Sequence, residues 1–293
     1  MKNRLFTGSG VAIVTPFTSD GIDFGRLGSL IDFHVENNTD AIIICGTTGE
    51  ASTMHDPEHM AAIKFAVEHT AGRLPVIAGT GSNYTQHSID LSKYAQSVGA
   101  DGLLQVTPYY NKTTQKGLYE HFKAIADSVD IPIILYNVPS RTGMNIAVDT
   151  LVKLAEIDNI TAIKEASGNI SYVSEIAAKV PDMDIYSGND DMVVPVMSVG
   201  GIGVISVAAN IIPQQMHDMC TMYMQGDVKG ALKIQLDALD LINKLFIEVN
   251  PIPIKTAMNL LGYKVGGLRA PLCDMTDGDL ETLKKALGAY GLM

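Results

Sequence analysis

The chain has 293 residues, of which 46% are hydrophobic and 18% charged, and its formal net charge is −11. This composition is too apolar for a disordered protein, and the length is about what one complete α/β barrel needs. Because a negative surface repels phosphate, the charge argues against nucleic acid as a partner.

Short apolar runs of strand length recur along the first two thirds of the chain. They are continuously apolar rather than alternating, which is typical of strands covered on both faces. Between them the apolar spacing becomes helical, as for Leu27, Leu30, Ile31 and His34. We expect eight strands, at residues 11–15, 41–45, 75–79, 102–106, 132–136, 160–164, 184–187 and 203–207.

Strands that alternate with helices in this way predict a closed parallel (β/α)8 barrel, the TIM barrel. A doubly wound open sheet is the alternative, but the glycine-rich GxGxxG or GxxxxGK[ST] turn that it would need does not occur in the sequence. Beyond about residue 210 only helical patterns remain. We therefore predict a barrel over residues 1–225 and a small C-terminal helical appendage over residues 226–293.

Signals for targeting or disulfide bonding are sparse. The first ten residues, MKNRLFTGSG, contain no apolar stretch of signal length, and no segment approaches a membrane span. Cys45, Cys220 and Cys273 lie far apart without metal-binding spacing, and Cys45 ends an apolar run as a small core residue would. We expect a soluble, cytoplasmic protein with no membrane partner.

In a barrel the site lies at the carboxyl ends of the strands, so strand-end residues are the candidates for chemistry. Lys164 ends the apolar run at residues 160–163, where burial would lower the pKa of its amine. A partly neutral amine can attack a keto carbon and form an imine. The alternative is a structural lysine that reaches solvent or pairs with a neighbouring carboxylate.

Two other strand ends carry groups that suit imine chemistry. Tyr136 ends the preceding strand, where its phenol could move protons, although a half-buried core tyrosine is the commoner explanation of such a residue. Thr47 and Thr48 lie in a glycine-flanked turn that presents hydroxyl and backbone N–H groups together, which suits a carboxylate. Such turns are common, so this one alone does not identify a site.

Three motifs in this order and spacing resemble the pyruvate-dependent class I aldolases, the superfamily of dihydrodipicolinate synthase and N-acetylneuraminate lyase. The motifs are Gly46-Thr47-Thr48-Gly49-Glu50, Tyr136-Asn137-Val138-Pro139 and Lys164-Glu165. The resemblance runs from Thr7-Gly8-Ser9 through Asn250-Pro251-Ile252-Pro253 to the end of the chain. It implies that Lys164 forms an imine with pyruvate.

Within the superfamily, the chain is more similar to the synthases. The turn has Thr47-Thr48 where the lyases typically carry Ser-Thr, and Arg141 stands where the synthases bind the carboxylate of aspartate semialdehyde. This resemblance implies condensation of pyruvate with L-aspartate-4-semialdehyde to 4-hydroxy-tetrahydrodipicolinate, the branch point of diaminopimelate and lysine biosynthesis. The alternatives are a lyase of N-acetylneuraminate or 2-keto-3-deoxy sugar acids, or a catalytically silent keto-acid-binding relative.

The resemblance also implies the remaining roles. The catalytic residues would be Lys164, Tyr136, Thr47 and Tyr110, the last supplied by a neighbouring subunit, and the substrate-binding residues would be Thr48, Arg141, Gly188, Ile205 and Asn250. The imine is itself the electron sink, so neither a metal nor an organic cofactor is expected. The implied assembly is a homotetramer of tight dimers, in which oligomerisation completes the site.

Many synthases are inhibited by lysine at a subunit interface, and the matching positions here are mixed. Ser52, His59, Asn83, His87 and Tyr109 fall on this regulatory site by resemblance. However, Asp56 replaces a histidine of the lysine-sensitive members, and His87 replaces the glutamate that would hold the lysine amine. We therefore predict weak or absent inhibition by lysine. The alternative for the histidines at 55, 59 and 87 is a plain surface role.

Overall fold

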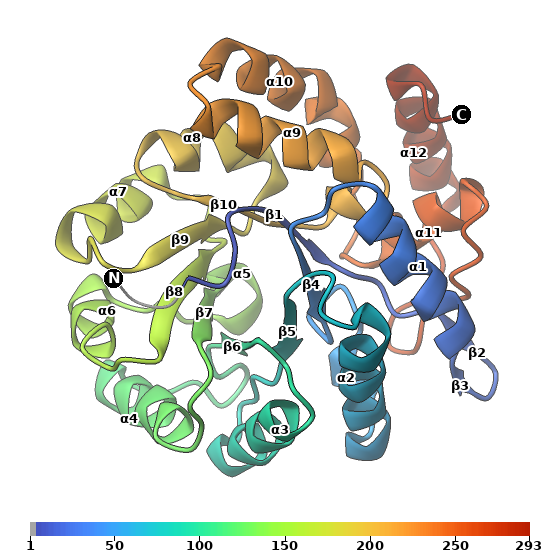
Figure 1. The fold of residues 1–293 in the computed structure, drawn as a ribbon. Coiled ribbons are helices and arrows are strands. Elements are labelled where there is room, and N and C mark those ends of the chain that lie inside the picture. Colours follow the sequence, from blue (N-terminus) through green and yellow to red (C-terminus); the bar gives the residue numbers. More distant parts are fainter. Residues whose placement is uncertain (1–3) are drawn as a thin grey trace.

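The computed structural model describes residues 4–293, in which eight parallel strands close into a barrel surrounded by helices (Figure 1). Around the barrel the order is β1, β10, β9, β8, β7, β6, β5 and β4, and β4 closes onto β1. This confirms the predicted TIM barrel. The strands are β1 (Gly8–Ala12), β4 (Ala41–Ile44), β5 (Val76–Gly79), β6 (Gly102–Val106), β7 (Ile133–Asn137), β8 (Ile160–Glu165), β9 (Asp184–Ser187) and β10 (Gly203–Ser206).

Helices cover the outside of the barrel, and short elements cap its strand ends. The covering helices are α1 (Phe24–Glu36), α2 (Asp56–Thr70), α3 (Thr85–Ser97), α4 (Gln115–Ala126), α6 (Val148–Leu154), α7 (Ile170–Lys179), α8 (Val193–Ser198) and α9 (Pro213–Met224). The short elements are the hairpin β2 (Phe17–Thr18) and β3 (Gly21–Ile22), the helix α5 (Pro139–Thr142), and the 3-10 turns η1 (Ala51–Thr53), η2 (Asp190–Met192) and η3 (Ala208–Asn210).

The first strand begins earlier than its apolar run indicated. It was expected at residues 11–15 and lies at Gly8–Ala12. A side chain at Gly10 would place its Cβ 2.6 Å from Ile43 Cδ1 and 2.8 Å from Phe6 Cζ, so any larger residue there would displace these two side chains. Counting apolar residues overlooks a strand start that is made of small residues, and this accounts for the error.

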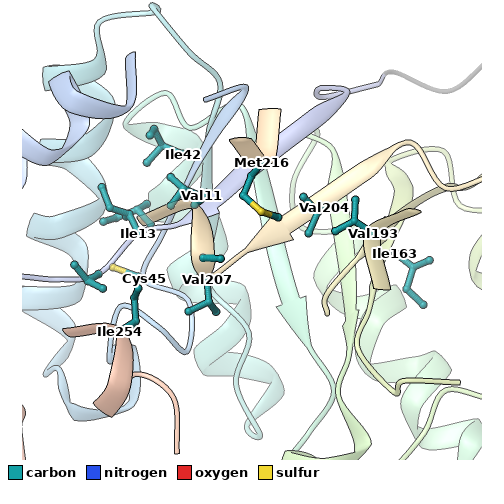
Figure 2. Packing of buried hydrophobic residues seen from close by; sticks show 14 of the residues in the cluster. Val11, Ile13, Ile42, Cys45, Ile163, Val193, Val204, Val207, Met216 and Ile254 are labelled. Atoms are coloured by element: carbon teal, nitrogen blue, oxygen red, sulfur yellow. The ribbon is translucent and has the colours of Figure 1, made fainter. Parts of the chain in front are cut away.

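The buried residues form two layers, one on each face of the barrel strands. The smaller cluster contains strand residues from all around the barrel but no helix residue, so it fills the interior. The larger cluster joins the strands to the helices, and Figure 2 shows part of it around Val11, Ile42 and Val204. Ala162 belongs to the inner cluster and Ile163 to the outer one. Alternation along β8 therefore directs Lys164 into the barrel.

The helices α10 (Val228–Lys244), α11 (Ile252–Leu260) and α12 (Asp277–Tyr290) follow α9. In Figure 1 α10 lies outside α9, while α11 and α12 lie on the side of the barrel that carries α1. Their buried residues Leu241, Ile254 and Leu283 belong to the same cluster as the outer face of the barrel. The division at residues 225 and 226 stays a prediction. Within residues 4–293, no helix combines the length and apolar character that spanning a bilayer requires.

Candidate active site

Lys164 and Tyr136 are the penultimate residues of two neighbouring strands and lie against each other inside the barrel. The register of β7 and β8 pairs Tyr136 with Lys164 directly. The Lys164 Nζ lies 4.4 Å from the centroid of the Tyr136 ring, and the lysine is only 6% exposed. The amine is thus held against an aromatic face and away from bulk water, which is the environment that imine formation by a lysine needs.

The electrostatics of this pair favour a neutral amine and a protonated phenol. Burial lowers the pKa of Lys164 to about 8, with attraction to Asp190 opposing the shift and repulsion from Arg141 adding to it. With that pKa, about a tenth of the amine is neutral at pH 7. Burial raises the pKa of the Tyr136 hydroxyl, against the effects of Arg141 and of a hydrogen bond to Thr47. Tyr136 therefore keeps a proton that it can donate.

The turn after β4 lies beside this pair and is tied to the C-terminal part of the chain. Thr47 is exposed and its side chain influences the Tyr136 hydroxyl from close by, whereas Thr48 is buried. Asn250 joins two of the predicted substrate-binding residues. Its Nδ2 donates to Thr48 Oγ1 at 3.0 Å, and its backbone oxygen accepts from Arg141 Nη2 at 3.1 Å. Asn250 thus holds the threonine turn and the guanidinium in a common frame.

These residues surround one cavity of about 170 Å³ at the carboxyl ends of the strands. One water needs about 10–15 Å³ of such space, so the cavity admits a small molecule of several heavy atoms. A Cβ at Gly188 would lie 2.6 Å from the Cβ of Ala166, so a glycine there lets the end of β9 approach the segment after β8. The predicted residues that line the cavity are Thr47, Thr48, Tyr136, Arg141, Lys164, Gly188 and Asn250.

Two predicted site residues do not line this cavity. Tyr110 is 92% exposed on the loop after β6, in a left-handed backbone conformation with φ of 68°. The Tyr110 side chain therefore points into solvent and away from the barrel of its own chain. Ile205 is 1% exposed and packs in the interior cluster, and Val207, two residues further along, lines the cavity instead.

Asp190 is a buried carboxylate near the site to which the sequence assigned no role. It is 2% exposed, and its Oδ2 accepts the backbone N–H groups of Val207 at 3.0 Å and Ala208 at 2.9 Å. Its Oδ1 is buried without a hydrogen-bond partner among the described residues. Asp190 attracts the Lys164 ammonium, so it moderates the effect of burial on that amine. In the sequence it is one of two adjacent aspartates in a loop, a pattern that equally suits a solvated turn.

A second cavity, of about 460 Å³, adjoins the first and holds most of the predicted regulatory residues. Ser52, His59, His87 and Tyr109 line it together with Asp56, and it also reaches Thr47, Tyr136 and Arg141. Asn83 does not line it, and its backbone oxygen accepts from Asn111 Nδ2 at 2.9 Å.

The histidines of the second cavity are held by protein groups. His59 is 6% exposed, with Nε2 2.8 Å from the backbone oxygen of Gly79, so the surface alternative is wrong for this residue. The His87 ring lies between two neighbours, with Nε2 2.9 Å from Asp56 Oδ1 and Nδ1 3.1 Å from Ser82 Oγ. The two residues that depart from the lysine-sensitive pattern therefore bind each other. Within residues 4–293 no group of three or more His, Cys, Asp or Glu side chains is placed to hold a metal ion.

Imine catalysis needs a partly neutral amine, a proton carrier beside it and a binding site for the carboxylate of the substrate. A TIM barrel that provides all three is typical of the class I aldolases. The chain matches the model of the dihydrodipicolinate synthetase family over residues 5–290 and belongs to that family. The predicted resemblance is thereby confirmed, as is the assignment to the lyases.

Relatives with assigned names agree over the whole length. The 4-hydroxy-tetrahydrodipicolinate synthase of Clostridium novyi (strain NT) is 63% identical over 287 residues, covering 98% of this chain and 97% of the relative. The crystal structure of dihydrodipicolinate synthase from Aquifex aeolicus has a TM-score of 0.96 at 48% identity. The match covers 98% of this chain and 99% of the Aquifex chain. A structure described as a monomeric dihydrodipicolinate synthase variant also has a TM-score of 0.96, at 38% identity. The match covers 99% of this chain and 98% of the variant's chain.

Proposed function

We propose that this chain condenses pyruvate with L-aspartate-4-semialdehyde to give 4-hydroxy-tetrahydrodipicolinate, through an imine between Lys164 and pyruvate. Family membership and full-length relatives that carry this activity in their names support the overall reaction over the sugar-acid alternatives. The observation that carries the assignment of residues is the buried Lys164 amine with a pKa of about 8, facing Tyr136 in the same cavity as Thr47 and Thr48.

Pyruvate binds first in this proposal. The hydroxyl and backbone N–H groups of Thr47 and Thr48 hold its carboxylate, which places the keto carbon at the neutral Lys164 amine. Attack gives a carbinolamine, and the loss of one water gives the imine. Tyr136 donates and accepts the protons of this dehydration, and its contact with Thr47 supports a relay through that hydroxyl.

Tyr110 extends the relay from a second copy of the chain. Its 92% exposure and its position on a loop beside the second cavity support a role outside its own barrel. The proposed assembly is a homotetramer built from tight dimers, in which each dimer completes two sites. A monomer in solution, the state named for one similar structure, would refute this assembly.

The carbon–carbon bond forms in the second half of the reaction. The imine loses a methyl proton to become an enamine, and the enamine carbon attacks the aldehyde of the semialdehyde, whose carboxylate Arg141 holds as a bidentate partner. The amine of the semialdehyde then attacks the imine carbon, releases Lys164 as a free amine and closes the ring. The electron pair of the broken methyl C–H bond forms the enamine C=C bond as the C=N pair moves onto the imine nitrogen, so the proposed reaction uses no metal or organic cofactor.

Asn250, Gly188 and Ile205 complete the proposal as residues that shape the pocket. Asn250 holds both the threonine turn and Arg141, and Gly188 lines the cavity. Ile205 would act through the wall of the barrel beneath the cavity, because its side chain is in the interior cluster. The second cavity, with Ser52, His59, Asn83, His87 and Tyr109 in or near it, is the proposed place for regulation.

The test is a coupled assay with pyruvate, aspartate semialdehyde and an NADPH-dependent dihydrodipicolinate reductase. We expect turnover by the wild-type protein, none by Lys164→Ala, and a borohydride-trapped pyruvate adduct on Lys164 in the wild type only. Trapping without turnover would point to a different aldolase activity. The absence of both would refute imine chemistry in this protein.

A further inference from the structure

A buried ion pair lies directly behind the threonine turn and has no part in the reaction described above. Glu50 ends the Gly46-Thr47-Thr48-Gly49-Glu50 motif, and Lys255 lies on α11 in the C-terminal region. The Lys255 Nζ and Glu50 Oε1 are 2.8 Å apart, and the two side chains are 1% and 0% exposed. A pair so completely removed from water is costly to bury unless its remaining hydrogen bonds are satisfied.

The ammonium group of Lys255 joins three segments that are remote in sequence. Besides Glu50, it donates to the backbone oxygen of Thr15 at 3.1 Å, after β1, and to that of Gly267 at 2.6 Å. Thr15 in turn donates from Oγ1 to the backbone oxygen of Gly49 at 2.7 Å. All three protons of the ammonium are used. Glu50 belongs to the threonine turn, and Thr15 contacts that turn through Gly49.

The turn needs such support because its backbone is strained at both ends. Cys45 and Glu50 both have φ of 56°, in the left-handed region that non-glycine residues avoid. Such conformations persist where the surroundings over-determine them, and they cluster at functional sites. Here the strained ends flank the two threonines that the proposed function assigns to the substrate carboxylate.

The other oxygen of Glu50 connects the turn to a second C-terminal contact. Glu50 Oε2 accepts the backbone N–H of Arg269 at 3.0 Å. The Arg269 guanidinium binds both oxygens of Glu58, at 2.5 and 2.6 Å, and lies 3.8 Å from the centre of the Phe17 ring. The segment from Glu50 to Glu58 is therefore attached to the C-terminal region at both ends.

We propose that the Glu50–Lys255 pair is a positioning device by which α11 sets the place of Thr47 and Thr48, and so the affinity of the enzyme for pyruvate. This inference rests on the proposed function, in which those threonines hold the pyruvate carboxylate. The C-terminal helices lie outside the barrel wall (Figure 1). In this proposal α11 nevertheless contributes to substrate recognition. Neither residue touches the substrate, because neither lines the cavity that holds Lys164.

The test compares Lys255→Met with the double variant Glu50→Gln/Lys255→Met. The single variant leaves a buried carboxylate without its cation, so it is the less stable protein, and the double variant removes both charges and recovers part of the lost stability. If the pair positions the turn, both variants need about tenfold more pyruvate for half-maximal borohydride trapping. The KM for aspartate semialdehyde, which depends on Arg141, should change less than about twofold.

Leu283→Ala is the matched control, because Leu283 is buried in the same C-terminal region but lies on α12, whereas Lys255 lies on α11. It should lower the stability while leaving half-saturation by pyruvate unchanged. Unchanged half-saturation in the double variant, or an equal rise in Leu283→Ala, would overturn the proposal in favour of a purely structural pair. Wild-type protein that traps no pyruvate would overturn the proposed function itself, and this inference with it.

Discussion

Replacing Lys164 with methionine should abolish activity and yet stabilise the fold. Methionine has nearly the same length and shape but no charge, so it fills the same space against the Tyr136 ring. In the wild type the folded state must either hold an ammonium group at 6% exposure or release its proton. In the proposed function, this cost accompanies the nucleophilic amine that imine formation requires.

The size of the effect follows from the pKa of Lys164. A fall from the ordinary value of 10.5 to about 8 corresponds to about 3 kcal/mol of destabilisation. The attraction of Asp190 is already contained in that value. Because the folded state binds the proton less tightly than the unfolded state, the cost is complete below about pH 8. It fades as the pH rises from there towards 10.5, so wild type and variant should converge.

Thermal melts of both proteins at pH 7 and at about pH 10 measure this difference. We expect the variant to melt about 5 °C higher at neutral pH and with little difference at the higher pH. Lys229→Met, at an exposed position of α10, is the control and should change the free energy of unfolding by less than about 0.5 kcal/mol at either pH. A Lys164→Met protein that is no more stable than the wild type at neutral pH would refute the argument that burial lowers this pKa.

Three further predictions concern the reaction and its control. Arg141→Ala should lower kcat/KM for aspartate semialdehyde about 100-fold, as expected for the loss of a charged hydrogen bond. Borohydride should still trap pyruvate on this variant, and loss of trapping would place Arg141 in pyruvate binding instead. Tyr136→Phe should keep the fold but slow imine formation about 100-fold in rapid-mixing experiments, and an unchanged rate would exclude its phenol from the relay. Lysine should inhibit weakly, because His87 replaces the glutamate that would hold the lysine amine and the nearby Asp56 carboxylate already binds His87. Half-inhibition in the micromolar range would contradict this.

The sequence by itself determined the fold class and indicated the centre of the candidate site. Continuous apolar runs separated by helical spacing are local patterns, and they mark strands covered on both faces wherever the chain goes next. Lys164 and Tyr136 could be identified in the same way, because each ends such a run and strand ends of a barrel meet at one rim. The small residues at the start of β1 carry no such pattern, and there the prediction was displaced towards the apolar residues that follow.

Only the tertiary structure decided which distant groups meet. The Glu50–Lys255 and Thr48–Asn250 contacts join residues 205 and 202 positions apart, and nothing local in either segment specifies its partner. The burial of His59 and the closeness of Asp190 to Lys164 likewise depend on how helices and loops dock on the barrel. Periodicity and turn chemistry arise between near neighbours in the chain. The pairing of remote polar groups arises only when the barrel closes and α11 packs against it, because burial then compels each charge to find a partner.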